Sequence, residues 1–204
     1  MKYDFDAPGA KVLPPAKLAH VVLRTSNFAP MVQFYKTFLS ASPAFENDTF
    51  CFMSYDEEHH RIGIINIPIV GPKNVLTAGL EHIAFTYDTL DELAMSYLQR
   101  KENNIRPVWT TNHGATTSIY YKDPDGNILE TQVDNFDTNE ETNAFIMSEA
   151  YQTNPIGVDF DPEHLVSRLK SGEDHASIKR RTEIGPRSID TVPREFVGDV
   201  HASP

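Results

Sequence analysis

The sequence predicts an α+β fold made of two βαβββ modules, because the chain repeats one strand and helix pattern within itself. The segment Leu18–Leu23 aligns with Leu80–Phe85 at an offset of 62 residues, and this alignment matches His20 with His82. Each segment starts as a short β-branched run and continues into apolar residues at three- and four-residue spacing, which is typical of a strand followed by an amphipathic helix. Two such modules can each bury one face against a shared core.

The first module is expected over residues 17–67 and the second over residues 80–134, joined by the Pro- and Gly-containing linker 68–79. After its helix, the first module is expected to form strands at Ala44–Glu46, Phe50–Tyr55 and His60–Ile67. The corresponding strands of the second module are expected at Ile105–Trp109, Thr116–Lys122 and Asn127–Val133. Turn residues such as Asp and Gly separate these segments.

The two ends of the chain are expected to lie outside the modules. Residues 1–16 are expected to form an N-terminal arm, and residues 135–204 a polar C-terminal extension. Short helices are predicted in the extension at Thr138–Ala150 and Pro162–Lys170, and the prolines beyond them suggest an extended, poorly packed tail. The extension is either a surface wrap or disordered end, or a lid or dimer arm over the site.

Length, charge and cysteine usage limit the class of protein. The chain has 204 residues and a net charge of -11, which fits one domain with an appendage and argues against binding to nucleic-acid phosphates. It contains no apolar run near the ~20 residues of a membrane span and no apolar signal segment after Met1, so we expect a soluble, cytoplasmic protein. The single cysteine, Cys51, fits a reducing compartment. A small molecule is the expected partner.

Three side chains have the chemistry and the placement of metal ligands. His20 and His82 occupy matched positions in the first strands of the two modules, where they would face each other across a shared cavity. Alternation along the strand 127–133 puts Glu130 on a face with Ile128, where a carboxylate is costly unless it is paired or metal-bound. Two histidines and one carboxylate form a facial triad that leaves open positions on an Fe(II)-type metal. Either histidine alone would be more typical of a core residue, but the matched pair favours a metal.

The sequence resembles the vicinal oxygen chelate superfamily, which includes glyoxalases, fosfomycin-resistance proteins, bleomycin-binding proteins and type I extradiol dioxygenases. The resemblance covers about residues 17–134 and is carried by Leu18–Thr25, Leu80–Tyr87, His113-Gly114 and Ser118–Glu130. It implies that the paired modules curl into a half-open barrel around a metal. In that family the ligands come from the first strand of each module and the last strand of the second, which implies His20, His82 and Glu130.

Within the superfamily, the resemblance is strongest to small type I extradiol dioxygenases, which place further histidines and a tyrosine around the metal. It implies His60, His113 and Tyr120 as catalytic residues. A histidine would move a proton, and the tyrosine would hydrogen-bond a substrate oxygen. The implied activity is cleavage of a catecholic aromatic diol by O₂ with Fe(II), Mn(II) being the other candidate metal. The subfamily suggests a bicyclic diol, and relatives of this architecture are often homodimers.

Other interpretations stay open from the sequence. A non-oxidative isomerase, or a thiol transferase of the fosfomycin type, would keep the metal and show no O₂ uptake. A non-catalytic binder would bind a small molecule without turnover. Each proposed catalytic residue also has a plainer interpretation: His60 as a surface residue beside an acidic turn, His113 as a loop residue and Tyr120 as a core residue.

Overall fold

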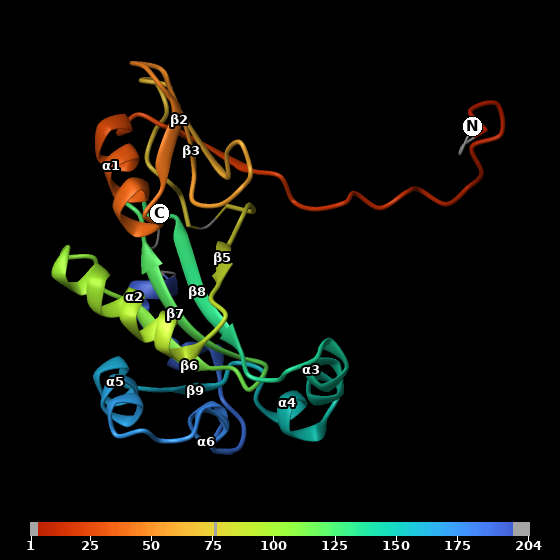
Figure 1. Ribbon diagram of the computed structural model, residues 1–204, viewed down its shortest axis with the longest axis vertical. Helices are drawn as coiled ribbons and strands as arrows, with labels where there is room; N and C mark the ends of the chain where they lie inside the picture. The colour runs from red at the N-terminus through yellow and green to blue at the C-terminus, as the bar shows by residue number, and fades with distance from the viewer. Residues whose placement is uncertain (1–3, 76, 198–204) are drawn as a thin grey trace.

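The computed structural model describes residues 4–75 and 77–197, which fold as two βαβββ modules followed by a largely helical extension (Figure 1). The first module contains β1 (Val21–Thr25), α1 (Phe28–Phe38), β2 (Ser42–Glu46), β3 (Phe50–Ser54) and β4 (Ile62–Asn66). The second contains β5 (His82–Thr86), α2 (Leu90–Glu102), β6 (Trp109–Asn112), β7 (Thr116–Lys122) and β8 (Ile128–Asp134). The extension adds α3 (Asn139–Ile146), α4 (Glu149–Thr153), β9 (Val158–Asp159), α5 (Pro162–Lys170), α6 (His175–Lys179), the 3-10 helix η1 (Ile189–Thr191) and α7 (Arg194–Val197).

Both modules arrange their strands in the same order, as the internal repeat predicts. The first sheet has the order β1-β4-β3-β2, with β1 parallel to β4. The second has the order β5-β8-β7-β6-β9, with β5 parallel to β8. No strand pairing joins the two sheets within the described residues, so they do not close into a barrel. The predicted α+β class with paired βαβββ modules is confirmed.

The helices of the two modules form for reasons that are readable in the sequence. Buried residues of α1 recur on one helical face, at Met31, Val32, Tyr35 and Phe38. Helix α2 begins with a capping box: the Thr89 side chain accepts from the Glu92 N–H, and the Glu92 carboxylate accepts from the Thr89 N–H.

One strand of the second module lies later than its sequence pattern predicts. The expected strand was Ile105–Trp109, whereas β6 starts at Trp109 and ends at Asn112. Strand β6 lies between β7 and β9, so both of its edges are occupied. Pro107 has no N–H to donate to either neighbour, which explains why the strand starts after it.

Arg100 of α2 joins the two modules. Its side chain is buried, and its Nε and Nη2 donate to the carbonyl oxygen of Phe38 at 3.1 and 2.7 Å. Nη2 also donates to the Tyr87 hydroxyl at 2.8 Å. The Phe38 ring in turn packs edge-on against Tyr121 of β7, with ring centroids 5.2 Å apart. A buried charge with satisfied hydrogen bonds therefore fixes the end of α1 to the second module.

The extension is packed on the second sheet. Residues 180–188, in the predicted extended tail, form no helix or strand and are mostly exposed, although individual side chains anchor them. Strand β9 pairs antiparallel with β6, and the Trp109 indole N–H donates to Asp159 at 2.7 Å. Arg187 donates to both oxygens of the same carboxylate, at 2.6 and 2.8 Å. These contacts compensate for the sparse apolar residues that made the segment look unstructured. Figure 1 shows α5 and α6 beside the β9 edge of this sheet.

Both predicted helices of the extension are present, but the first of them is divided into two shorter helices. Helix α5 spans the predicted Pro162–Lys170, and the Asp161 side chain caps it by accepting from the Glu163 N–H at 2.8 Å. The predicted helix Thr138–Ala150 is divided into α3 and α4, because Ser148 ends one helix and caps the next.

The remaining described segment is the N-terminal arm. Its residues 4–16 contain no helix or strand and project away from the modules (Figure 1). Across the described part of the chain, every helix is too short or too polar to cross a membrane.

Replacing Arg100 with methionine should lower the free energy of unfolding by about 2–4 kcal/mol, because the buried Phe38 carbonyl and Tyr87 hydroxyl lose their donor. Urea denaturation followed by tryptophan fluorescence measures the change. The exposed Arg106 is the matched control, and Arg106→Met should change stability by less than about 0.5 kcal/mol. Equal effects of the two substitutions would contradict the role of Arg100.

Candidate active site

A buried carboxylate lies at the centre of the second sheet. Glu130 is in the middle of β8, is 5% exposed, and has β5 on one side and β7 on the other. Its Oε2 lies 3.1 Å from Nε2 of His82, the first residue of β5. A buried carboxylate needs such a partner, since burial without one is costly. The two side chains are therefore adjacent because neighbouring parallel strands carry them.

Tyr120 and His113 continue this set of contacts. Tyr120 of β7 is paired directly with Glu130 in the strand register, and its hydroxyl donates to Oε1 at 2.9 Å. His113, between β6 and β7, places Nε2 2.9 Å from the same hydroxyl. A tyrosine hydroxyl carries one proton, so Tyr120 can donate to Glu130 or to His113 but not to both at once. The four side chains, including His82, form one continuous set of hydrogen-bond contacts, with the Tyr120 hydroxyl between Glu130 and His113.

The contacts shift the pKa values of the four groups in different directions. The hydrogen bond with Glu130 outweighs burial and raises the pKa of His82. Burial works to raise the pKa of Glu130, but hydrogen bonds from His82 and from two hydroxyls outweigh it, and the pKa is lowered. Burial and the charge of Glu130 raise the pKa of Tyr120 well above its usual value, whereas burial lowers the pKa of His113. At neutral pH the site therefore combines an ionised Glu130 carboxylate with a neutral His113 imidazole.

His82 and Glu130 have the donor atoms of a metal site. Nε2 of His82 faces the carboxylate, and its Nδ1 is buried and has no hydrogen-bond partner among the residues described. Imidazole and carboxylate ligands together suit divalent iron and related metals. Among the residues that the structure describes, however, no group of three His, Cys, Asp or Glu side chains is placed to hold a metal ion. Two of the three predicted ligands are together, and the third is not with them.

The third predicted ligand, His20, lies in a histidine cluster of the first module. It is exposed, directly precedes β1, and stacks on His60 with ring centroids 4.2 Å apart. His60 Nδ1 is 2.6 Å from Nδ1 of His59. Burial, followed by the charges of His20 and His59, lowers the pKa of His60. The six predicted residues are thus divided: His20 and His60 in one group, and His82, Glu130, Tyr120 and His113 in the other.

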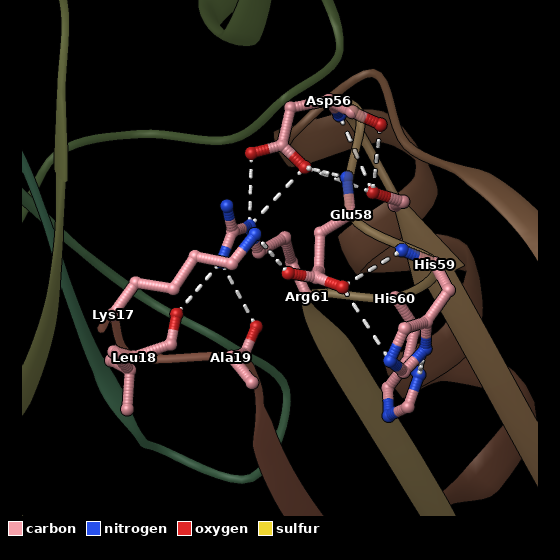
Figure 2. Close-up of polar contacts among 9 residues, drawn as sticks. Lys17, Leu18, Ala19, Asp56, Glu58, His59, His60 and Arg61 are labelled. Atoms are coloured by element: carbon pink, nitrogen blue, oxygen red, sulfur yellow. Dashed lines mark hydrogen bonds and ion pairs between the residues drawn. The ribbon is translucent and has the colours of Figure 1, made fainter. Parts of the chain in front are cut away.

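Arg61 holds the main chain that carries His20. Figure 2 shows its guanidinium between the turn after β3 and the residues before β1. Nη1 donates to the carbonyl oxygens of Leu18 and Ala19 at 2.7 and 3.0 Å, and Nε donates to Asp56 at 2.9 Å. A second ion pair, Lys17 with Glu58 at 2.5 Å, ties the same two segments together. The position of His20 is therefore determined by charged contacts within the first module.

Sequence reasoning did not identify Ser118 and Phe196 as residues of the site. Ser118 is fully buried and acts to lower the pKa of Glu130; strand alternation puts it on the face of Tyr120, so the pattern could have revealed it. Trp109 stacks on Tyr120 at 5.0 Å, and Phe196 of α7 lies edge-on to Tyr120, also at 5.0 Å. No sequence signal pointed to Phe196, because it is far along the chain from both modules.

A cavity of about 1000 Å³ borders this site. It is lined by residues of β1, by the linker between the modules, by the turn before β8 and by Phe196. Neither His82 nor Glu130 lines it. Ile128 and Phe196 do, and both also pack with Trp109 and Tyr120. The cavity therefore meets the candidate site across these two apolar side chains.

Comparison with known proteins supports the family that the motifs indicate. The family model described as "Glyoxalase/Bleomycin resistance protein/Dioxygenase superfamily" matches residues 17–131. The chain is 44% identical to Biphenyl-2,3-diol 1,2-dioxygenase 2 of Rhodococcus globerulus over 76% of this chain and 83% of the relative. It is 41% identical to Biphenyl-2,3-diol 1,2-dioxygenase 3 of the same organism over 81% of this chain and 88% of the relative.

A solved structure agrees on the fold. The crystal structure of a glyoxalase/dioxygenase from Nostoc punctiforme superposes with a TM-score of 0.50 at 19% identity, covering 62% of this chain and 98% of that one. The matched family model spans both βαβββ modules, and the two dioxygenases match over most of their own lengths. The chain therefore belongs to the glyoxalase/bleomycin resistance protein/dioxygenase superfamily.

Proposed function

We propose that this protein is an extradiol ring-cleaving dioxygenase that acts on a catecholic aromatic diol with O₂. The observation that carries the proposal is the continuous contact of His82, Glu130, Tyr120 and His113 on one face of the second sheet. This set combines two metal-type ligands with two groups that can exchange a proton. It occurs in a chain 44% identical to a protein named for the cleavage of biphenyl-2,3-diol.

The proposed metal is Fe(II), with Mn(II) as the other candidate. His82 and Glu130 would bind it. His20 stays the proposed third ligand, although the structure places it in the separate histidine stack of the first module. When bound, such a metal supplies Lewis acidity for the diol oxygens and the redox chemistry that O₂ requires. Glu130 is suited to this role because hydrogen bonds with its neighbours keep it ionised although it is buried.

His113 and Tyr120 would manage protons beside the diol. The lowered pKa of His113 leaves its imidazole neutral at neutral pH, so that it can accept a proton from a substrate hydroxyl and return it later. The Tyr120 hydroxyl would hydrogen-bond a substrate oxygen as charge develops on it. His60 is the alternative proton-transfer residue, and it would act from the first module beside His20.

The aromatic side chains around Tyr120 favour an aromatic substrate. Trp109, Tyr120 and Phe196 pack together beside the carboxylate, and Phe196 also lines the large cavity. Rings of this kind bind another aromatic ring by stacked or edge-on contact. A bicyclic diol, whose second ring would extend toward this cavity, is the proposed substrate.

We also propose the module boundaries given above, a homodimeric assembly and a cytoplasmic location. Cys51, the single cysteine, is fully buried, which is consistent with a thiol that stays reduced.

Protein loaded anaerobically with Fe(II) should consume O₂ when given biphenyl-2,3-diol and should form a yellow ring-opened product. An oxygen electrode and an absorbance scan measure this, with Mn(II)-loaded protein assayed in parallel. Full metal occupancy without O₂ uptake on monocyclic and bicyclic diols would contradict the proposal and favour a non-oxidative isomerase or thiol transferase. Ligand binding without any turnover would favour a non-catalytic binder.

Substitutions should separate the metal ligands from the proton-transfer groups. His20→Gln, His82→Gln and Glu130→Gln should lose bound metal, because each removes a ligand. His113→Asn and Tyr120→Phe should keep the metal and lower kcat by about 10²–10⁴-fold, the usual contribution of a proton-transfer group.

Elemental analysis and steady-state kinetics measure the two effects. The control is His164→Asn in α5, an exposed histidine that should change neither quantity. Loss of metal from His113→Asn and Tyr120→Phe to the same extent as from the ligand variants would contradict the assigned roles.

A further inference from the structure

The C-terminal extension surrounds the turn that carries His113. Strand β9 pairs with β6 directly before this turn, joining Asn112 to Val158. The Asn112 side chain also donates to the carbonyl oxygen of Lys179 at 2.9 Å. We infer that the extension is a positioning element of the active site, and that Arg181 is the residue through which it holds His113. This inference rests on the proposed function in so far as His113 acts in catalysis.

Arg181 is the central contact. Its side chain is 2% exposed, and Nη1 donates to the carbonyl oxygens of His113 and Asn154 at 3.0 and 2.7 Å. Nη2 donates to the carbonyl oxygen of Ala150 at 3.0 Å, and Glu183 balances the charge. One buried guanidinium therefore connects the His113 turn to two positions around α4. A planar, five-donor group can do this, whereas an ammonium group has fewer directions in which to donate.

Two glycines allow the extension to approach the turn this closely. Gly114 follows His113 at φ +91°, and a Cβ there would lie 2.3 Å from the Phe145 ring of α3. Gly157 has φ +103°, and a Cβ there would lie 2.5 Å from the Asn112 carbonyl oxygen. Side chains at either position would force the turn and the extension apart. The extension therefore packs closely against the residues on both sides of His113, at Asn112 and at Gly114.

The extension also constrains the His113 ring. The main chain of Ile156 and Pro155 in the extension acts to raise the pKa of His113 against the effect of burial, while the ring Nε2 lies 2.9 Å from the Tyr120 hydroxyl. The Trp109 ring lies edge-on to His113 at 5.6 Å, and its indole N–H is bound by Asp159 of β9. Within the described part of the chain, the hydrogen bonds and ion pairs of Arg181 go to His113, Asn154, Ala150 and Glu183, and none goes to His82, Tyr120 or Glu130. Arg181 therefore acts through His113 and is a positioning residue.

The test compares Arg181→Met and Arg181→Lys with the control Arg168→Met. Arg168 also pairs within the extension, with Glu173 at 2.5 Å, but does not contact the His113 turn. For biphenyl-2,3-diol cleavage, Arg181→Met should lower kcat by about 10–100-fold, as expected for a misplaced catalytic group. The value of KM and the metal content should stay within about twofold, since the metal ligands are untouched. Arg181→Lys should recover part of the loss, and Arg168→Met should match the wild type.

A second readout does not depend on activity. Nitrogen-15 NMR of ring-labelled histidine reports the hydrogen bonding of each imidazole nitrogen, and His113→Asn identifies the His113 signals among the eight histidines. Arg181→Met should shift or broaden the His113 signals, and Arg168→Met should not. Gly114→Ala would place a Cβ against the Phe145 ring of α3 and so press the extension away from the His113 turn. It should give the same NMR change, and it replaces Arg181→Met if that variant does not fold.

The outcomes separate the two proposals. Unchanged His113 signals in folded Arg181→Met and Gly114→Ala would overturn the positioning role. A parallel loss of kcat and stability in Arg168→Met would also overturn it, because the extension would then act only through general stability. If the wild type shows no O₂ uptake but the NMR changes occur as described, the positioning inference stands and the proposed reaction fails.

Discussion

Burying the Glu130 carboxylate is the constraint on which the rest of the site depends. A carboxylate that is only 5% exposed has lost most of its hydration, so it requires hydrogen-bond or ionic partners within the protein. β5 supplies His82 on one side, and β7 supplies Tyr120 on the other. The parallel β5–β8 pairing and the antiparallel β7–β8 pairing put both partners next to the same residue. The arrangement that satisfies the carboxylate also produces a pair of metal-type ligands with a proton donor beside it.

The site extends outward from this carboxylate through one hydroxyl. Tyr120 can share its proton with Glu130 or with His113, so the orientation of His113 affects the charge environment of the carboxylate. That orientation depends on the C-terminal extension, which binds the main chain next to His113 and places Phe196 against Tyr120. The extension is thus coupled to the candidate site by direct contacts, although it lies outside both modules.

The two modules contribute unequally in this structure. The second holds four of the six predicted residues in mutual contact, and the first holds His20 and His60 in a separate stack. Arg61 fixes the segment before His20, while Arg100 fixes the end of α1 to the second module. Two buried or partly buried arginines therefore determine where the first module presents its histidines. Because their contacts are hydrogen bonds to carbonyl oxygens, they set backbone position as well as charge.

Much of the fold followed from the sequence alone. The internal repeat at an offset of 62 residues predicted the duplicated βαβββ architecture. This prediction was possible because hydrophobic periodicity and turn residues are local properties of the chain. Alternation in β8 put Glu130 on an inward face, and the family motifs pointed to His82, Tyr120 and His113. Local patterns did not give the full bounds of β6: Pro107 marks where the strand starts, but its pairing with the distant β9 is not visible in the sequence. They also could not show that Arg181 and Phe196 reach the site. Those contacts join segments far apart in sequence, and only the packed tertiary structure decides them, because packing selects partners by shape and hydrogen-bond geometry rather than by period.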